Sequence, residues 1–202
     1  MVNQSRDALH AVIRQVFDES LRLKGEVLER QQDAIVQMAL CITEALRAGH
    51  KLMLFGNGGS AADAQHLAAE FVNRFQLQRP PLAALALTVD SSILTSIGND
   101  FSFAEIFQRQ IEALATAGDV ALGISTSGRS PNVLLALEWA RRNGLATIGW
   151  AGGRTTAMDQ SCDLMLHVPT AVTARIQEVH ITVGHILCQL VEQLLYPEGG
   201  TR

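Results

Sequence analysis

Five short apolar segments, most of them followed by glycine or small polar residues and then by a helical pattern, constrain the fold of this chain most strongly. They are apolar on both faces, which is typical of strands in a parallel sheet that is covered on both sides. The expected strands are residues 52–55, 82–87, 120–124, 146–150 and 164–168, and the expected helices are near 61–76, 104–116, 131–143 and 172–195. This alternation predicts an α/β protein with three layers, α/β/α.

The segment before the first expected strand has a helical pattern instead. Its apolar residues recur at spacings of three and four, and Gly49 is of a type that commonly ends a helix. The residues are Leu9, Val12, Ile13, Val16, Phe17 and Leu21, then Ile35, Met38, Ala39, Ile42, Ala45 and Leu46. We expect two helices that pack on the core, with an oligomer interface as the alternative. The chain is thus predicted to be one domain with an N-terminal helical extension.

The composition excludes several classes of protein. Of the 202 residues, 16 are basic and 20 acidic, and this net charge of −4 argues against a nucleic-acid binder that works by bulk electrostatics. No apolar run approaches the roughly 20 residues that span a bilayer, and the N-terminus has no secretory core. Three widely spaced cysteines, Cys41, Cys162 and Cys188, fit free thiols in a reducing compartment. We therefore expect a cytoplasmic protein with no direct nucleic-acid or membrane partner.

A glycine-rich loop follows the first expected strand, with the sequence FGNGGS at residues 55–60. Small residues let a ligand approach the backbone, and the helix that follows offers unpaired N–H groups to an anion. The spacing is neither that of a dinucleotide fingerprint nor that of a Walker loop. A tight turn explains Gly58 and Gly59 but not Asn57 and Ser60, so an anion-binding loop is the better interpretation.

A hydroxyl-rich loop follows the third expected strand and precedes a helix at Pro131. Its hydroxyl residues are Ser125, Thr126, Ser127 and Ser130. Alone, such a loop is usually a solvated turn with helix caps. Paired with the glycine-rich loop on a neighbouring strand end, where open parallel sheets bind ligands, it predicts a phosphate site. Arg129 either adds charge or is simply exposed.

Two helices carry further candidates. His66 and Glu70 are four residues apart and share one helix face, which Arg74 extends; taken as an isolated pair, they favour an ion pair at a buried edge. In the last helix, His180 and His185 diverge by roughly 140° at about 100° per residue. We therefore expect one of these two histidines to address a given site, and periodicity does not choose between them.

The motifs together resemble the sugar isomerase (SIS) domain family. They are GNGGSAADAQHLAAE at 56–70, GND at 98–100, GISTSGRSPNV at 123–133 and ARIQEVHITVGHIL at 174–187. The resemblance implies a five-stranded flavodoxin-like subunit in a homotetramer. It also implies one SIS domain over residues 1–202, with the helical extension at 1–49 and the α/β/α core at 50–197.

The resemblance further implies roles for individual residues. Glu70 and His185 match the acid/base pair of the family. Residues implied to bind substrate are Asn57, Gly58, Gly59, Ser60, Arg74, Asp100, Ser125, Thr126, Ser127, Ser130 and Gln177, with the hydroxyl groups on the phosphate and Asn57 and Asp100 on the sugar. In members of the family that bind zinc, the residues that hold the ion match His66, Glu70, Gln177 and His185.

By this resemblance, the chain is an aldose–ketose isomerase that converts sedoheptulose 7-phosphate to D-glycero-D-manno-heptose 7-phosphate for lipopolysaccharide precursors. The reaction passes through an enediol, with Glu70 as base and His185 as partner, or with zinc polarising the carbonyl. The alternative is a non-catalytic sugar-phosphate-binding relative that associates with the replication initiator. In that relative the positions matching Glu70 and His185 hold other residues, so we favour the enzyme.

Overall fold

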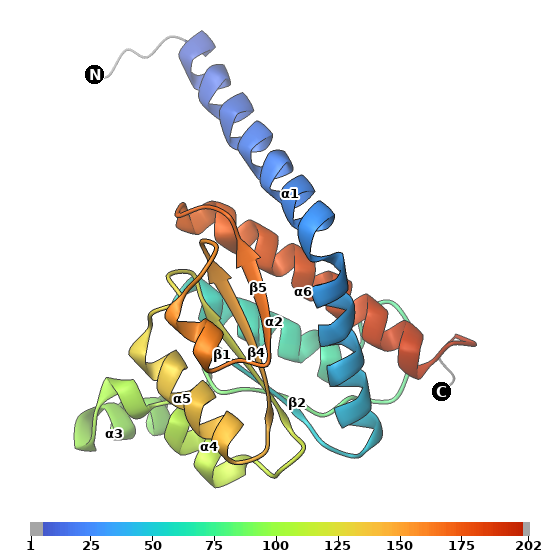
Figure 1. Ribbon diagram of the computed structural model, residues 1–202, viewed down its shortest axis with the longest axis vertical. Helices are drawn as coiled ribbons and strands as arrows, with labels where there is room; N and C mark the ends of the chain where they lie inside the picture. The colour runs from blue at the N-terminus through green and yellow to red at the C-terminus, as the bar shows by residue number, and fades with distance from the viewer. Residues whose placement is uncertain (1–5, 200–202) are drawn as a thin grey trace.

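The five apolar segments form one parallel sheet, and a computed structural model that describes residues 6–199 shows how they are ordered (Figure 1). The strands are β1 (Leu52–Gly56), β2 (Ala84–Ala86), β3 (Val120–Ser125), β4 (Ala146–Gly152) and β5 (Leu164–Val168). Their order is β2-β1-β3-β4-β5, and every neighbouring pair is parallel. This is the order of flavodoxin-like sheets. The predicted α/β/α class and five-stranded sheet are confirmed.

Alternate residues of the strands point to opposite faces, so each face builds its own core. Leu52 and Leu54 face one helical layer, and Met53 and Phe55 face the other. The first layer contains α1 (Arg6–Arg47), α2 (Gly59–Val72) and α6 (Thr173–Leu195). The second contains α3 (Ser91–Asp100), the 3₁₀ turn Phe103–Glu105, α4 (Gln108–Leu114) and α5 (Pro131–Arg142), and a further 3₁₀ turn spans Ala157–Gln160.

Helix α3 was not predicted from the sequence. It begins after Asp90, whose side chain accepts a hydrogen bond from the backbone N–H of Ile93 (2.9 Å). Only one of its residues, Ile97, is buried, so the helix lies at the surface of its layer. The helix expected near 104–116 is instead divided into the 3₁₀ turn and α4.

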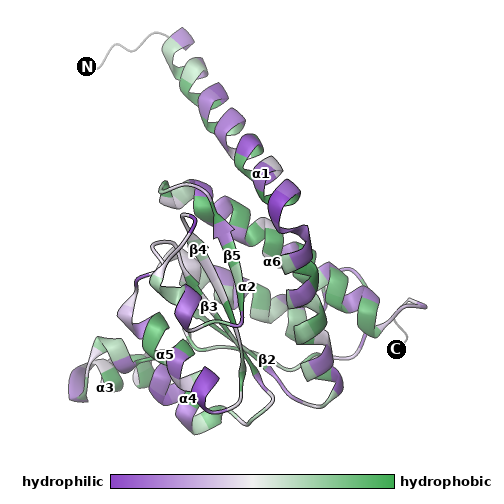
Figure 2. Cartoon of the chain, in the orientation of Figure 1, coloured by the Kyte–Doolittle hydropathy of each residue, from purple (hydrophilic) through white to green (hydrophobic). Residues whose placement is uncertain are grey.

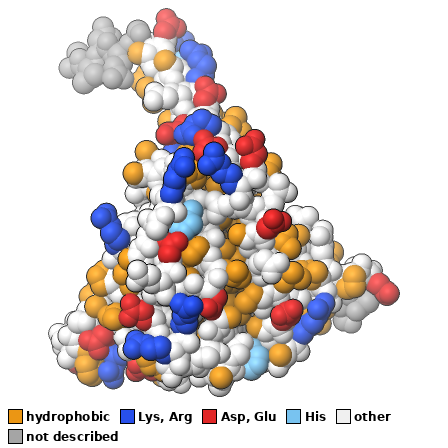
Figure 3. Space-filling model, viewed as in Figure 1, with side chains coloured by type: hydrophobic (Ala, Val, Ile, Leu, Met, Phe, Trp, Pro, Cys, Tyr) orange, Lys and Arg blue, Asp and Glu red, His pale blue; other side chains and the backbone are white. Residues whose placement is uncertain are grey.

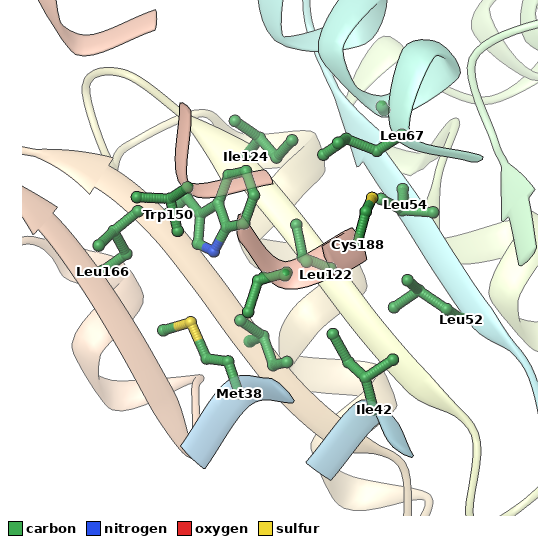
Figure 4. Packing of buried hydrophobic residues seen from close by; sticks show 14 of the residues in the cluster. Met38, Ile42, Leu52, Leu54, Leu67, Leu122, Ile124, Trp150, Leu166 and Cys188 are labelled. Carbon is green, nitrogen blue, oxygen red and sulfur yellow. The ribbon is translucent and has the colours of Figure 1, made fainter. Parts of the chain in front are cut away.

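Helix α1 is interrupted by a kink at Gln31, where the backbone is non-helical (φ −131°, ψ 15°). The Gln31 side-chain amide donates to the carbonyl of His167 in β5 and accepts from the N–H of the same residue (2.9 Å). Beyond the kink, α1 packs on the sheet, and Met38 and Ile42 are fully buried (Figure 4). The prediction of two helical segments is therefore confirmed, although the chain does not turn between them.

The first part of α1 projects away from the body (Figure 1), whereas Leu23 and Val27, which also precede the kink, are buried in the core. Apolar and polar residues alternate along it (Figure 2), and charged side chains surround the apolar ones on its surface (Figure 3). We call its six predicted apolar residues the projecting stripe: Leu9, Val12, Ile13, Val16, Phe17 and Leu21. They are 39–66% exposed. The expectation that these six residues pack on the core of their own chain is therefore wrong, and the oligomer-interface alternative stays a prediction.

Across residues 6–199, no helix combines the length and apolarity that crossing a membrane requires.

The buried half of α1 should contribute strongly to stability. We expect Met38→Ala to lower the free energy of unfolding by about 2–5 kcal/mol, because it leaves a cavity against the sheet. Val36→Ala is the matched control, since Val36 is 45% exposed on the same helix, and should change stability by about 0.5 kcal/mol or less. Chemical denaturation of both variants measures this. Equal effects would contradict the assignment of this segment to the core.

Candidate functional site

The glycine-rich and hydroxyl-rich loops lie side by side because β1 and β3 are neighbours in the sheet. Gly56 at the end of β1 is in register with Ile124, one residue before the end of β3. Because β2 lies on the other side of β1, the strand order reverses between β1 and β3. Open α/β sheets bind ligands in the crevice at such a switch point.

A cavity of about 300 Å³ lies between these two loops and the start of α6, and we call it the strand-end cavity. Its lining is Asn57, Gly58, Gly59, Ser60, Ile124, Ser125, Thr126, Ser130, Thr173 and Gln177. The hydroxyl oxygen of Ser125 lies 2.9 Å from that of Ser130 and 3.4 Å from that of Ser127. The two loops thus surround the cavity with hydroxyl groups, and no acidic side chain lines it.

Helices α2 and α5, which follow the two loops, have no hydrogen bond from a capping side chain at their N-termini. Gly58 precedes α2 with a positive φ of 56°, which favours glycine, and Ser130 precedes α5 with its hydroxyl turned to Ser125. Asn57 and Asn132 exchange two side-chain hydrogen bonds (2.9 and 2.8 Å), which hold the two loops together. Both helix N-termini are therefore available to an anion in the cavity.

A second cluster joins α2 to α6 and contains His66, Glu70 and His185; we call it the His–Glu cluster. The Nε2 atoms of His66 and His185 are 3.0 Å apart, and His66 Nε2 lies 3.4 Å from Glu70 Oε1. The ring of Phe75 stacks on that of His185, with centroids 5.5 Å apart. A carboxylate and two imidazoles in contact form a set of groups that can move protons.

The structure separates the two histidines of α6. His180 is fully buried, and its ring lies 5.7 Å from that of Trp150. Burial lowers the pKa of His180 to about 4, so it is neutral at neutral pH. His185 is partly exposed and faces His66. The choice that helical periodicity left open is therefore made by packing, in favour of His185.

Gln177 belongs to the strand-end cavity and not to the His–Glu cluster. A Cβ atom on Gly59 would lie 2.4 Å from Gln177 Nε2, so the amide packs directly on the first turn of α2. His185 follows eight residues later, about 12 Å along the helix axis. The structure thus brings together three of the four implied zinc ligands. Within the described part of the chain, no group of three or more His, Cys, Asp or Glu side chains is placed to hold a metal ion.

Three implied substrate residues lie outside the strand-end cavity. Helix α2 ends at Val72, so Arg74 does not extend the line of His66 and Glu70, and its side chain is exposed. Asp100 is the exposed last residue of α3 and accepts a hydrogen bond from the Asn99 amide. Ser127 is exposed and, with Arg129, lines a neighbouring cavity of about 680 Å³. Ser127 still belongs to the hydroxyl-rich loop and contacts Ser125, whereas one chain alone does not bring Arg74 or Asp100 to the two strand-end loops.

The sequence analysis missed a buried ion pair beside the cluster. Arg79 Nε donates to Glu192 Oε1 (2.9 Å), and both side chains are almost fully buried. Burial by itself raises the pKa of Glu192, but bonds from backbone N–H groups and the charge of Arg79 outweigh it, so this pKa is lowered. The sign of this pair in the sequence is Glu192, a single acidic residue within the apolar segment LCQLVEQLL at 187–195.

The cysteine nearest to the cluster is not a nucleophile. Burial, followed by the charges of Glu70 and Glu192, raises the pKa of Cys188 to about 12. Its thiol therefore stays protonated at neutral pH, and thiolate chemistry at this site is excluded.

Comparison with known proteins agrees with this geometry. Residues 15–152 match the SIS domain family. The chain is 50% identical to a phosphoheptose isomerase of Nitratidesulfovibrio vulgaris over 94% of its own length and 91% of that protein. It is also 50% identical to one of Aquifex aeolicus, covering 91% and 96% of the two chains. The structure of phosphoheptose isomerase GmhA from Neisseria gonorrhoeae superimposes with a TM-score of 0.86 at 40% identity, over 92% of this chain and 99% of that one.

The chain therefore belongs to the SIS-domain family and, within it, to the sugar-phosphate isomerases.

Proposed function

We propose that this chain interconverts the ketose and aldose forms of a phosphorylated heptose, from sedoheptulose 7-phosphate to D-glycero-D-manno-heptose 7-phosphate. The observation that carries the proposal is the His–Glu cluster, two helical turns from a hydroxyl-lined cavity on the same two helices. The relatives named phosphoheptose isomerase support the choice of a heptose. The initiator-associating alternative gains no support from these relatives.

The phosphate binds in the strand-end cavity. Ser60, Ser125, Thr126 and Ser130 supply hydroxyl groups, and the N-termini of α2 and α5 favour its negative charge. Ser127 joins them through its contact with Ser125. Gln177 and Asn57, at the rim, contact the first carbons of the sugar beyond the phosphate. Binding energy from the phosphate then places the distant carbonyl end at the His–Glu cluster.

Isomerisation moves one proton between adjacent carbons and a second proton between their oxygens. Glu70 removes the proton from the hydroxyl-bearing carbon next to the carbonyl, and the electron pair forms the carbon–carbon double bond of an enediol. His185 donates a proton to the carbonyl oxygen and later accepts one from the neighbouring hydroxyl. Glu70 then returns its proton to the former carbonyl carbon. The substrate and product have the same composition, and both residues return to their starting forms.

The donor chemistry of the cluster fits a zinc ion. Zinc accepts imidazole nitrogen and carboxylate oxygen, which His66, His185 and Glu70 supply, whereas a glutamine ligand is unusual. Gln177 is the fourth residue implied by resemblance, and it lies at the other end of the site. Zinc binding would require the three side chains of the cluster to turn toward a common centre. A bound ion would polarise the substrate carbonyl as a Lewis acid, which is an alternative to the acid/base route because a ligated carboxylate is a weaker base.

We also propose a setting for the activity: a homotetramer in the cytoplasm that supplies lipopolysaccharide precursors. The projecting stripe supports assembly, because six exposed apolar residues on one helix are costly to leave in water. Arg74 and Asp100, which one chain leaves outside the cavity, would reach a site only where subunits meet. The assignment of residues 1–202 to one SIS domain, with its core at 50–197, stays a prediction.

Removing the proton-transferring groups should abolish turnover without abolishing binding. We expect Glu70→Gln and His185→Asn each to lower kcat by at least about 10²-fold, since an acid/base step contributes about 10²–10⁴-fold. NMR detection of aldose phosphate, together with solvent deuterium exchange at the carbon beside the carbonyl, measures this. Wild-type protein that binds sedoheptulose 7-phosphate yet shows neither isomerisation nor exchange would show that the proposed function is wrong.

The phosphate site can be tested separately from catalysis. We expect Ser125→Ala combined with Thr126→Ala to raise KM sharply and to remove the thermal stabilisation given by sedoheptulose 7-phosphate, about 2.7 kcal/mol at 100 times Kd. Ser92→Ala, an exposed serine of α3, serves as the control. Unchanged affinity in the double variant would overturn the assignment of these loops to phosphate.

Zinc binding is predicted at His66, Glu70 and His185. Protein purified without a His tag or chelator should contain zinc close to one ion per chain, and His66→Ala should lose it. His10→Ala is the control, because His10 lies on the projecting segment of α1. Full activity after exhaustive chelation would exclude an essential metal, and equal zinc content in both variants would exclude this site.

The assembly prediction depends on the projecting stripe. Light scattering should give a mass of four 21.9 kDa chains at micromolar concentration. Ile13→Asp combined with Phe17→Asp should shift the protein to smaller species, because charge is then buried at the interface. Gln15→Asp adds charge to the same helix at a position outside the stripe and should leave the mass unchanged. A wild-type mass of one chain would refute assembly.

A further inference from the structure

The loop between α2 and β2 is fixed to α6 by one buried carboxylate. Glu192 accepts hydrogen bonds from the backbone N–H groups of Phe75, Gln76 and Leu77, each at 2.9 Å. Its fourth donor is Arg79 Nε, also at 2.9 Å. These four hydrogen bonds to the two carboxylate oxygens stabilise the buried negative charge and hold the backbone of residues 75–77 against α6.

Arg79 connects the same carboxylate to the end of α2. Its guanidinium donates to the backbone carbonyl of Phe71 (2.8 Å) and to that of Glu70 (2.9 Å). The side chains of Arg79 and Glu192 are 1% and 2% exposed. A buried ion pair is weak evidence for stability, because desolvation offsets its attraction. Here the pair instead sets the position of two features, the Glu70 backbone and the Phe75 backbone.

The ring of Phe75 covers one face of His185. The two rings are nearly parallel, with an interplanar angle of 21° and a centroid distance of 5.5 Å. The His66 ring lies 5.0 Å away, tilted by 52°. The His185 imidazole therefore lies against both rings, and turning it out of this contact would lose the stacking that aromatic pairs favour.

We propose that Phe75 is a positioning residue that keeps the His185 imidazole aimed at the His66–Glu70 side of the site, and that the buried Arg79–Glu192 pair fixes Phe75 there. The proposal rests on the proposed function of His185 in proton transfer. Phe75 itself touches no reacting atom. It acts by restricting the rotation of the ring that does, so the reacting groups are aligned before substrate binds.

The test compares kcat with KM. Phe75→Ala should lower kcat about 10- to 100-fold, because small misplacements of reacting groups have effects of this size. KM should stay unchanged, because the phosphate loops lie two helical turns away. Phe75→Tyr keeps the ring and should restore most of kcat. Gln78→Ala, an exposed residue of the same loop, is the matched control and should change neither constant.

Two further measurements keep the proposal falsifiable. A crystal structure of Phe75→Ala should show the His185 ring in more than one orientation, with a single orientation in the wild-type protein. Glu192→Gln should lower kcat in the same way as Phe75→Ala; where Glu192→Gln does not fold, the Phe75 variants decide. Unchanged kcat in Phe75→Ala, or an equally ordered His185 ring, would overturn the proposal. Wild-type protein without isomerase activity would refute the proposed function, while the crystal structures would still test the ring contact.

Discussion

The close packing of α2 against α6 is the contact on which the whole site depends. Glycine makes it possible at two levels: a Cβ on Gly59 would collide with Gln177, and one on Gly184 would lie 2.6 Å from Leu67. Because both glycines lack side chains, the two helices approach closely and hold a fixed register. That register sets the phosphate loop against Gln177 at one level and His66 against His185 two turns further along.

Under the proposed function, this arrangement separates substrate anchoring from chemistry while keeping both on one pair of packed helices. The hydroxyl groups of Ser125 and Ser130 converge at the strand ends, where helix dipoles favour an anion. The His–Glu cluster lies further along the same two helices, toward the end of α2. A ligand bound at one end would therefore place its far end beside groups that are already in position before binding.

Much of this could be predicted from sequence, because it depends on local patterns. Apolar runs located every strand, and the small and hydroxyl residues after two of them located the loops that line the strand-end cavity, since a parallel sheet brings those ends to one edge. The remainder depends on tertiary packing. Helical periodicity gave the angle between His180 and His185 but not the rotation of the helix against Trp150 that buries one of them.

The errors have the same origin. Arg74 was placed on a helix face, but α2 ends two residues earlier, where Arg79 binds the carbonyls of Glu70 and Phe71 from outside the helix. The role of Glu192 could not be deduced from its neighbours, because its partners lie more than 110 residues away along the chain. The projecting stripe has the pattern of a core helix, and sequence does not say whether its partner belongs to the same chain.

The kink in α1 has a consequence for how this protein avoids aggregation. A parallel sheet ends in two strands with unpaired backbone groups, and such edges can recruit strands from other molecules. At the β5 edge, the amide of Gln31 occupies both the N–H and the C=O of His167, as a neighbouring strand would. At the opposite edge, β2 is only three residues long. With His167 at one edge already paired and the other edge only three residues long, growth of the sheet into fibres is disfavoured.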